Sequence, residues 1–167
     1  MSIALIVMYM QKHFCSEALR ETMESISEKI NYSIDLFREN SKRIIWVQDE
    51  KDKHGNIMNP KGFEIIDFLK PEENEKRIIQ YHKKSFYETE LMEYLYTEKV
   101  NTIIVTGYYP LDCIFTTRTR HKGMLDYELT PYFLKDAIAG NKKFLSVLEM
   151  ISKTITIEEM EKILNNN

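Results

Sequence analysis

The chain has 167 residues, of which 43% are hydrophobic and 29% are charged, and its formal net charge at pH 7 is −3. These values are typical of a globular chain with a sizeable core, and they fit one domain over residues 1–167. Acidic and basic residues are mixed along the chain, which argues against a basic stripe for nucleic acid and against a polybasic helix for a membrane surface.

The first half of the chain predicts three strands and one long helix. The apolar run over residues 3–9 is too short for a membrane span and lacks the flanks of a signal peptide, so it predicts a buried strand. Apolar residues then recur at steps of three and four over residues 19–37, which indicates one face of a long helix. Residues 43–48 and 76–81 predict two further strands, and residues 49–62 a polar surface loop.

The second half continues the alternation of helices and strands. Pro131 lies within one of the predicted strands and indicates a sheet edge or a bulge there. The sequence TIEE, Thr156 to Glu159, has the pattern of a capping box that opens the last helix. The expected elements are helices over 89–98, 110–124 and 141–151, strands over 101–106 and 127–134, and a short strand near Thr154.

Such alternation predicts an α/β fold in which helices cover both faces of a parallel sheet. Binding sites in open parallel sheets form beyond the carboxyl ends of the strands. Here the segments after Tyr9, near Gln80 and after Gly107 follow three such ends, and we expect them to converge.

The sequence lacks the common motifs that bind a metal or a cofactor. The two cysteines form no disulfide framework, which fits a reducing cytoplasm, and no CxxC or HExxH motif is present. No glycine-rich phosphate loop follows residues 3–9. We therefore predict no metal and no cofactor, and we expect the scattered histidines to lie at the surface, namely His13, His54, His82 and His121.

Cys113 is the residue on which the functional interpretation depends. Pro110 suits the first turn of a helix, which would place Cys113 in the opening turn. Backbone amides and the helix dipole there stabilise a thiolate, and the same amides can hold an oxyanion. The alternative is a small buried hydrophobic residue, which is what a free cysteine usually is.

Five segments resemble the isochorismatase-like cysteine hydrolases, in the order in which that superfamily has them. ALIVMYMQKHF resembles the family's opening strand, ALLVIDMQNDF, and GYYPLDCIFTT resembles its G-x-x-x-x-x-C-V-x-x-T element, with Gly107, Cys113 and Thr117 in register. The others are KGFEIIDFLKP, SFYETELMEYL, and KDAIAG, which resembles a DA turn at Asp136 and Ala137. The resemblance implies a Rossmann-like three-layer α/β/α domain with a mainly parallel sheet.

The resemblance also implies a Cys–Asp–Lys triad, which this chain matches only in part. Cys113 takes the nucleophile position, but Tyr9 stands where the family has aspartate. Counting back from Phe86 places Gln80 at the lysine position, whereas a gap would place Lys83 or Lys84 there. The implied oxyanion donors are the amides of Cys113 and Tyr109, with a cis peptide bond between Tyr108 and Tyr109.

Other residues near the expected cleft leave alternatives open. Tyrosine is a poor base near neutral pH, so His13 or His82 is a candidate base, and Asp49 either lines the pocket or is a solvated loop carboxylate. Cys15 opens the first helix and has a structural role. Five aromatic residues are expected at the same rim, where they either line a flat ligand pocket or pack as ordinary edge residues. They are Tyr9, Phe14, Tyr81, Tyr108 and Tyr109.

The function that we predict is hydrolysis of an amide or related C–N bond of a small molecule, with Cys113 as nucleophile. The alternative is a catalytically inactive homologue that serves as a small-molecule-binding or regulatory module. The resemblance suggests a homodimer or a larger homo-oligomer.

Overall fold

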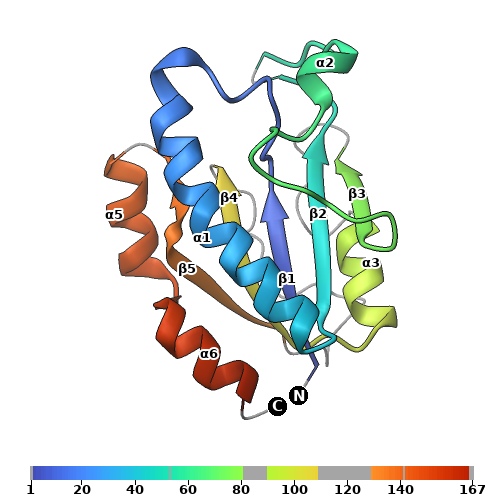
Figure 1. Ribbon diagram of the computed structural model, residues 1–167, viewed down its shortest axis with the longest axis vertical. Coiled ribbons are helices and arrows are strands. Elements are labelled where there is room, and N and C mark those ends of the chain that lie inside the picture. Colours follow the sequence, from blue (N-terminus) through green and yellow to red (C-terminus); the bar gives the residue numbers. More distant parts are fainter. Residues whose placement is uncertain (1, 53, 81–89, 109–128, 141, 166–167) are drawn as a thin grey trace.

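The computed structural model describes residues 2–52, 54–80, 90–108, 129–140 and 142–165. Within these residues, six strands form one sheet in the order β3-β2-β1-β4-β5-β6 (Figure 1). Every neighbouring pair is parallel, as the alternation of strands and helices predicts. The strands are β1 Ile3–Met8, β2 Arg43–Asp49, β3 Lys76–Gln80, β4 Thr102–Tyr108, β5 Thr130–Ala139 and β6 Thr154–Ile155.

Within the described residues, helices follow β1, β2, β3, β5 and β6. A short 3-10 turn, Glu17–Leu19, precedes the long α1, and a four-residue α2 ends the loop that was predicted after β2. The helix predicted over residues 110–124 lies outside the described residues. The helices are α1 Arg20–Glu39, α2 Pro60–Phe63, α3 Glu90–Thr97, α5 Lys142–Ile151 and α6 Ile157–Asn165.

Two apolar clusters, one on each face of the sheet, make the three layers. On one face the buried stripe of α1 packs with α6 against Leu5, Val7 and Trp46. On the other face α3 packs against residues such as Ile6 and Ile78. Because β1 is buried on both faces, its continuous apolar sequence is explained, and the three-layer α/β/α prediction is confirmed.

Gly107 allows the two central strands to lie close together. It pairs with Met8 of β1 at a φ of +112°, and a Cβ atom built there would lie 2.1 Å from the carbonyl oxygen of Met8. Only glycine tolerates both the backbone angle and the approach. The match of this glycine to the family motif therefore has a structural reason.

The fifth strand differs from its prediction. It runs over Thr130–Ala139, so Asp136 and Ala137, which were expected in a turn, lie within β5. The register against β4 shifts between Val105 and Gly107, after which Ile138 and Ala139 pair with the end of β4. The exposed Lys135 and Asp136 interrupt the apolar pattern, and this irregularity hid the continuation of the strand.

Pro131 has a local sheet edge beside it, as predicted. β6 pairs only with Phe133 and Leu134, so its two residues do not reach Pro131. The N–H that proline lacks is therefore not needed for a hydrogen bond to β6.

The predicted capping box is present at the start of α6. The N–H of Thr156 donates to the carboxylate of Glu159 at 2.8 Å, and the N–H of Glu159 donates to Oγ1 of Thr156 at 3.3 Å.

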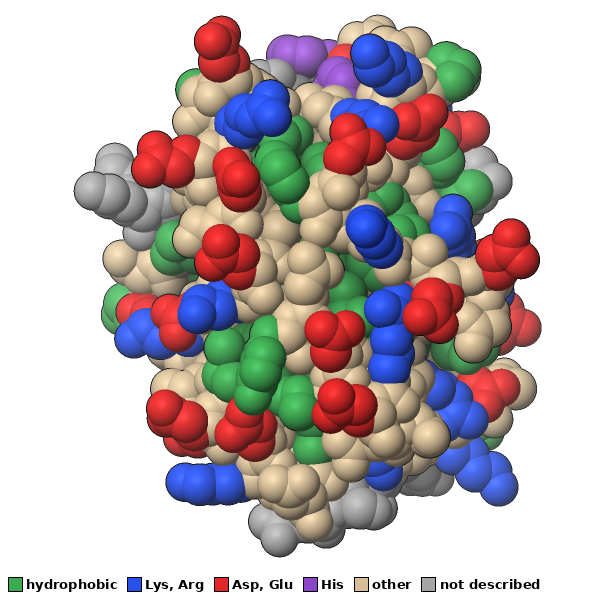
Figure 2. Space-filling view, in the orientation of Figure 1, with side chains coloured by type: hydrophobic (Ala, Val, Ile, Leu, Met, Phe, Trp, Pro, Cys, Tyr) green, Lys and Arg blue, Asp and Glu red, His purple; other side chains and the backbone are tan. Residues whose placement is uncertain are grey.

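The face that carries α1 mixes charges of both signs, and Figure 2 shows acidic and basic side chains interspersed over it. Both chain ends lie at the same end of the molecule (Figure 1). The carboxyl ends of β1 and β2 lie at the opposite end, beside α2.

Candidate functional site

The carboxyl ends of four neighbouring strands bring several of the predicted residues together. Asp49 at the end of β2 pairs with Gln80 at the end of β3, and Met8 at the end of β1 pairs with Gly107 in β4. Tyr9 follows β1 directly, and its N–H donates to the carbonyl of Val47 at 2.8 Å. The strand ends therefore lie side by side and define the candidate site, whereas the segments expected to converge after Gln80 and after Tyr108 lie outside the described residues.

Tyr9 and Gln80 form a buried, uncharged pair at this edge. Tyr9 is 6% exposed and Gln80 is 7% exposed, and the hydroxyl of Tyr9 donates a hydrogen bond to Oε1 of Gln80. Tyr9 has a φ of +52°, which is unusual for a bulky residue and turns its backbone out of the strand direction. The chain thus places side by side two residues that are 71 positions apart.

Nε2 of Gln80 is buried without a hydrogen-bond partner among the residues that the structure describes. The other atom of the amide, Oε1, is occupied by Tyr9. A donor is therefore available beside the tyrosine hydroxyl.

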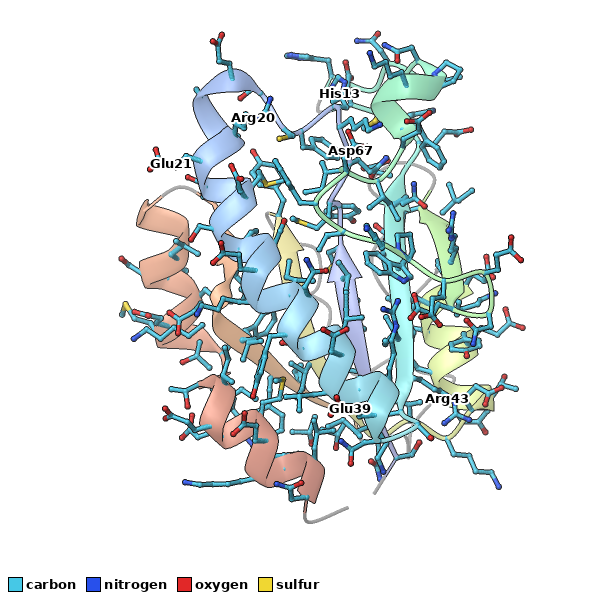
Figure 3. All side chains as sticks on the ribbon, in the orientation of Figure 1. His13, Arg20, Glu21, Glu39, Arg43 and Asp67 are labelled. Atoms are coloured by element: carbon cyan, nitrogen blue, oxygen red, sulfur yellow. The ribbon has the colours of Figure 1, made fainter. Side chains whose placement is uncertain are left out.

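Aromatic rings extend the site from Tyr9 towards β4. The ring of Phe14 lies 6.3 Å from that of Tyr9 and stacks on Tyr108 at 5.6 Å, with an interplanar angle of 29°. His13 contacts the edge of Phe14 at 5.4 Å. It is exposed at the upper end of the molecule, beyond β1 (Figure 3). The structure thus brings together three of the five aromatic residues expected at the rim.

Sequence reasoning missed Gln11, which holds this edge in shape. It is fully buried, and its amide donates to the carbonyls of Asp49 at 2.9 Å and Phe63 at 3.1 Å. Its Oε1 accepts the N–H of Asp49 at 2.7 Å. The signal was present, because Gln11 is the glutamine in the segment that resembles the family's opening strand.

A surface ion-pair cluster of Lys12, Glu64 and Asp67 links the two chain segments beside the candidate site. Lys12 Nζ lies 2.7 Å from Glu64 and 2.9 Å from Asp67, and these hydrogen bonds raise the pKa of Lys12. Asp67 lies below His13 in Figure 3. The segment after β1 is thereby tied to the segment after α2.

Asp49 is half-buried, and its carboxylate accepts a hydrogen bond from the nearby backbone N–H of Lys51 at 3.0 Å.

Cys15 lies five positions before α1, so it does not open that helix as predicted. It packs against the core, and burial raises the pKa of its thiol.

The remaining predicted site residues lie outside the described residues, namely Tyr81, His82, Lys83, Lys84, Tyr109 and Cys113. Within the described ranges, no three His, Cys, Asp or Glu side chains gather in a group that could hold a metal ion. The same ranges contain no helix with the length and apolar character needed to cross a membrane.

The sheet between two helical layers, with polar and aromatic side chains gathered beyond its strand ends, defines a Rossmann-like α/β protein. A model of the isochorismatase domain matches residues 3–154 of the chain. The chain therefore belongs to the isochorismatase family, within the isochorismatase-like hydrolase superfamily.

Individual relatives agree with this assignment. The uncharacterized isochorismatase family protein YrdC of Bacillus subtilis is 32% identical over 140 residues, which cover 82% of this chain and 73% of that protein. An isochorismatase-like hydrolase from Alkaliphilus metalliredigens has a TM-score of 0.78 at 19% identity, with 98% of this chain and 99% of that chain covered. N-carbamoylsarcosine amidase from Thermoplasma acidophilum has a TM-score of 0.73 at 19% identity, with 93% and 95% covered. At these identities the two solved structures show the shared fold.

Proposed function

We propose that the chain is a slow cysteine hydrolase that acts on an amide or related C–N bond of a small molecule. The observation that carries the proposal is the pairing of Tyr9 with Gln80 at the carboxyl edge of the sheet. By the resemblance, these are the positions of the family's aspartate and, without a gap, its lysine. The likeness in fold to an amidase supports the choice of a C–N bond.

Cys113 is the proposed nucleophile, and it follows the end of β4 by five residues. Its sulfur attacks the carbonyl carbon, the C–N bond breaks, and the nitrogen leaves with a proton as an amine or ammonia. Water then hydrolyses the thioester and frees the thiol. Backbone amides of Tyr109 and Cys113 are the proposed donors to the oxyanion.

The Tyr9–Gln80 pair makes this reaction slow. A phenol has an ordinary pKa of about 10, and the hydroxyl of Tyr9 already donates its proton to Gln80. Neither side chain supplies a carboxylate base, and general-base catalysis is typically worth about 10²–10⁴-fold in rate. We expect turnover below that of a complete triad by a factor in this range.

The test measures product release and intact mass on a panel of small amides and N-carbamoyl amines. We expect slow release by the unmodified protein, none by Cys113→Ala, and a rise of about tenfold in Tyr9→Asp, since a base is restored but a cavity remains. Hydrolysis that persists in Cys113→Ala would refute the nucleophile. Efficient hydrolysis that is lost in Tyr9→Asp would show a working site of another design.

A second candidate is an inactive homologue that binds a small molecule. The uncharged character of the Tyr9–Gln80 pair favours it, because the pair can hold a ligand but is poorly suited to move a proton. The panel above separates the two functions. Ligand binding with neither product nor thioester at Cys113, in the unmodified protein and in Tyr9→Asp, would establish the binding module.

A further inference from the structure

The three glutamines of the chain, Gln11, Gln48 and Gln80, are all buried. Burying an amide is costly unless its donors and acceptor find partners. Nε2 of Gln11 donates hydrogen bonds to two backbone carbonyls, and Nε2 of Gln48 donates one to the carbonyl of Phe63 at 2.9 Å. These two glutamines therefore have a structural explanation.

Gln80 differs, because its Nε2 has no partner among the described residues although the side chain is 93% buried (100% less the 7% that is exposed). Buried side-chain donors without a partner are rare in native proteins, and each one calls for an explanation. A leucine or methionine at the end of β3 would remove this donor, but it would also take the acceptor Oε1 from the hydroxyl of Tyr9. Nε2 is therefore a buried donor to which a bound molecule could supply the missing acceptor.

Among the residues that the structure describes, the groups in contact with the Tyr9–Gln80 pair are uncharged. The neighbour of the Gln80 amide is the hydroxyl of Tyr9, and the rings of Tyr9, Phe14 and Tyr108 continue the surface. At the adjacent strand end, the carboxylate of Asp49 accepts a hydrogen bond from the N–H of Lys51. A buried ionised group needs an opposite charge, and the Tyr9–Gln80 pair offers none.

We propose that Nε2 of Gln80 donates a hydrogen bond to the carbonyl-type acceptor of an uncharged, planar ligand that lies against these aromatic rings. The inference rests on the proposed function in that it concerns the same site. It specifies what the site selects, namely a neutral acceptor in preference to a carboxylate of the same shape.

Benzamide and benzoate are matched probes, because they share a planar ring and differ in the charge of the acceptor group. Binding is measured by calorimetry on Cys113→Ala protein, in which no thioester can form. We expect benzamide to bind at least about fivefold more tightly than benzoate. Gln80→Leu in the same background should weaken benzamide binding about tenfold, as expected for the loss of one buried hydrogen bond.

Gln48→Leu is the matched control, since it removes another buried glutamine from the end of a neighbouring strand. It should leave benzamide affinity within about twofold. If Gln80→Leu does not fold, protein labelled with ¹⁵N-glutamine answers the question without any change at Gln80. Benzamide should then shift the side-chain amide signals of Gln80 far more than those of Gln11 and Gln48.

Equal binding of benzoate, unchanged affinity in Gln80→Leu, no binding of either probe, or an unmoved Gln80 amide signal would each overturn the inference. The two proposals fail separately. Gln80-dependent binding without hydrolysis would remove the enzyme and keep the ligand site. Hydrolysis that requires Cys113 but is unaffected by Gln80→Leu would support the enzyme and refute the ligand site at Gln80.

Discussion

At the scale of single residues, Tyr9 and Gln80 form a buried hydrogen bond at the candidate site. Either residue alone would be a buried polar group, and together they satisfy the hydroxyl and one atom of the amide. The energetic consequence is a coupling between the two positions.

A double-mutant cycle measures that coupling. Tyr9→Phe should lower the free energy of unfolding by about 1–2 kcal/mol, because Oε1 of Gln80 loses its donor. The double variant Tyr9→Phe with Gln80→Leu should lie within about 1 kcal/mol of the unmodified protein, since both partners become apolar. Urea denaturation gives each value, and strictly additive effects would show that the two side chains do not interact.

Gly107 is the second residue with a sharp expectation. Gly107→Ala should lower the free energy of unfolding by more than about 3 kcal/mol, because the new Cβ meets the backbone of Met8 at a positive φ. Gly62→Ala is the milder comparison, since its Cβ would lie 3.3 Å from the side chain of His13, a tight contact that a small shift of this exposed side chain can relieve. Equal thermal stability of the two variants would contradict the close approach of β4 to β1.

At the scale of elements, the turn after β2 has a pH-dependent anchor. The carboxylate of Asp52 accepts the N–H groups of His54 at 2.8 Å and Asn56 at 2.9 Å, and the side-chain amide of Asn56 at 3.1 Å. The bonds from Asn56, backbone first, are the main reason why the pKa of Asp52 is lowered to about 2.

Because the folded pKa lies below the unfolded one, Asp52 stabilises the turn above pH of about 4, and this contribution disappears as the pH falls towards about 2. A ¹³C NMR titration should find the midpoint of Asp52 near 2. In Asn56→Ala the midpoint should rise, since one of its hydrogen bonds is lost while the backbone bond remains. A midpoint of about 4 in the unmodified protein would refute the anchor.

The elements were largely predictable because their signals are local. The continuous apolar run predicts the buried strand β1, and the three- and four-residue spacing of apolar residues predicts the buried face of α1. The TIEE sequence predicts the cap of the last helix. The end of β5 was missed because the register shift against β4 brings exposed residues into a strand. The short α2 was also missed, although Asn59 caps it and Pro60 begins it.

The site was less predictable, because its contacts join distant parts of the chain. The convergence of strand ends follows from parallel topology, and the aromatic rim was expected on that ground. The hydrogen bond from Tyr9 to Gln80 depends on the register of β1, β2 and β3, which no local pattern encodes. Gln11 was overlooked because a lone glutamine after a strand gives no sign of its backbone partners.

At the scale of the whole molecule, the fold separates a stable sheet from a site at one of its edges. The layers on both faces bury the strands, and the chain ends lie away from the carboxyl edge (Figure 1). The family assignment and this geometry leave one central claim, which is that Cys113 is an activated nucleophile.

Alkylation by iodoacetamide, followed for each cysteine by mass spectrometry at mildly acidic pH, tests that claim most directly. Cys15 is an internal reference, because burial raises the pKa of its thiol. Lowering a thiol pKa by one unit raises its reactivity about threefold, because the gain in thiolate exceeds the loss of nucleophilicity. We therefore expect Cys113 to react at least about threefold faster than Cys15 in the folded protein. In urea the two rates should become similar. If Cys113 reacts no faster than Cys15 in the folded protein, the claim is wrong.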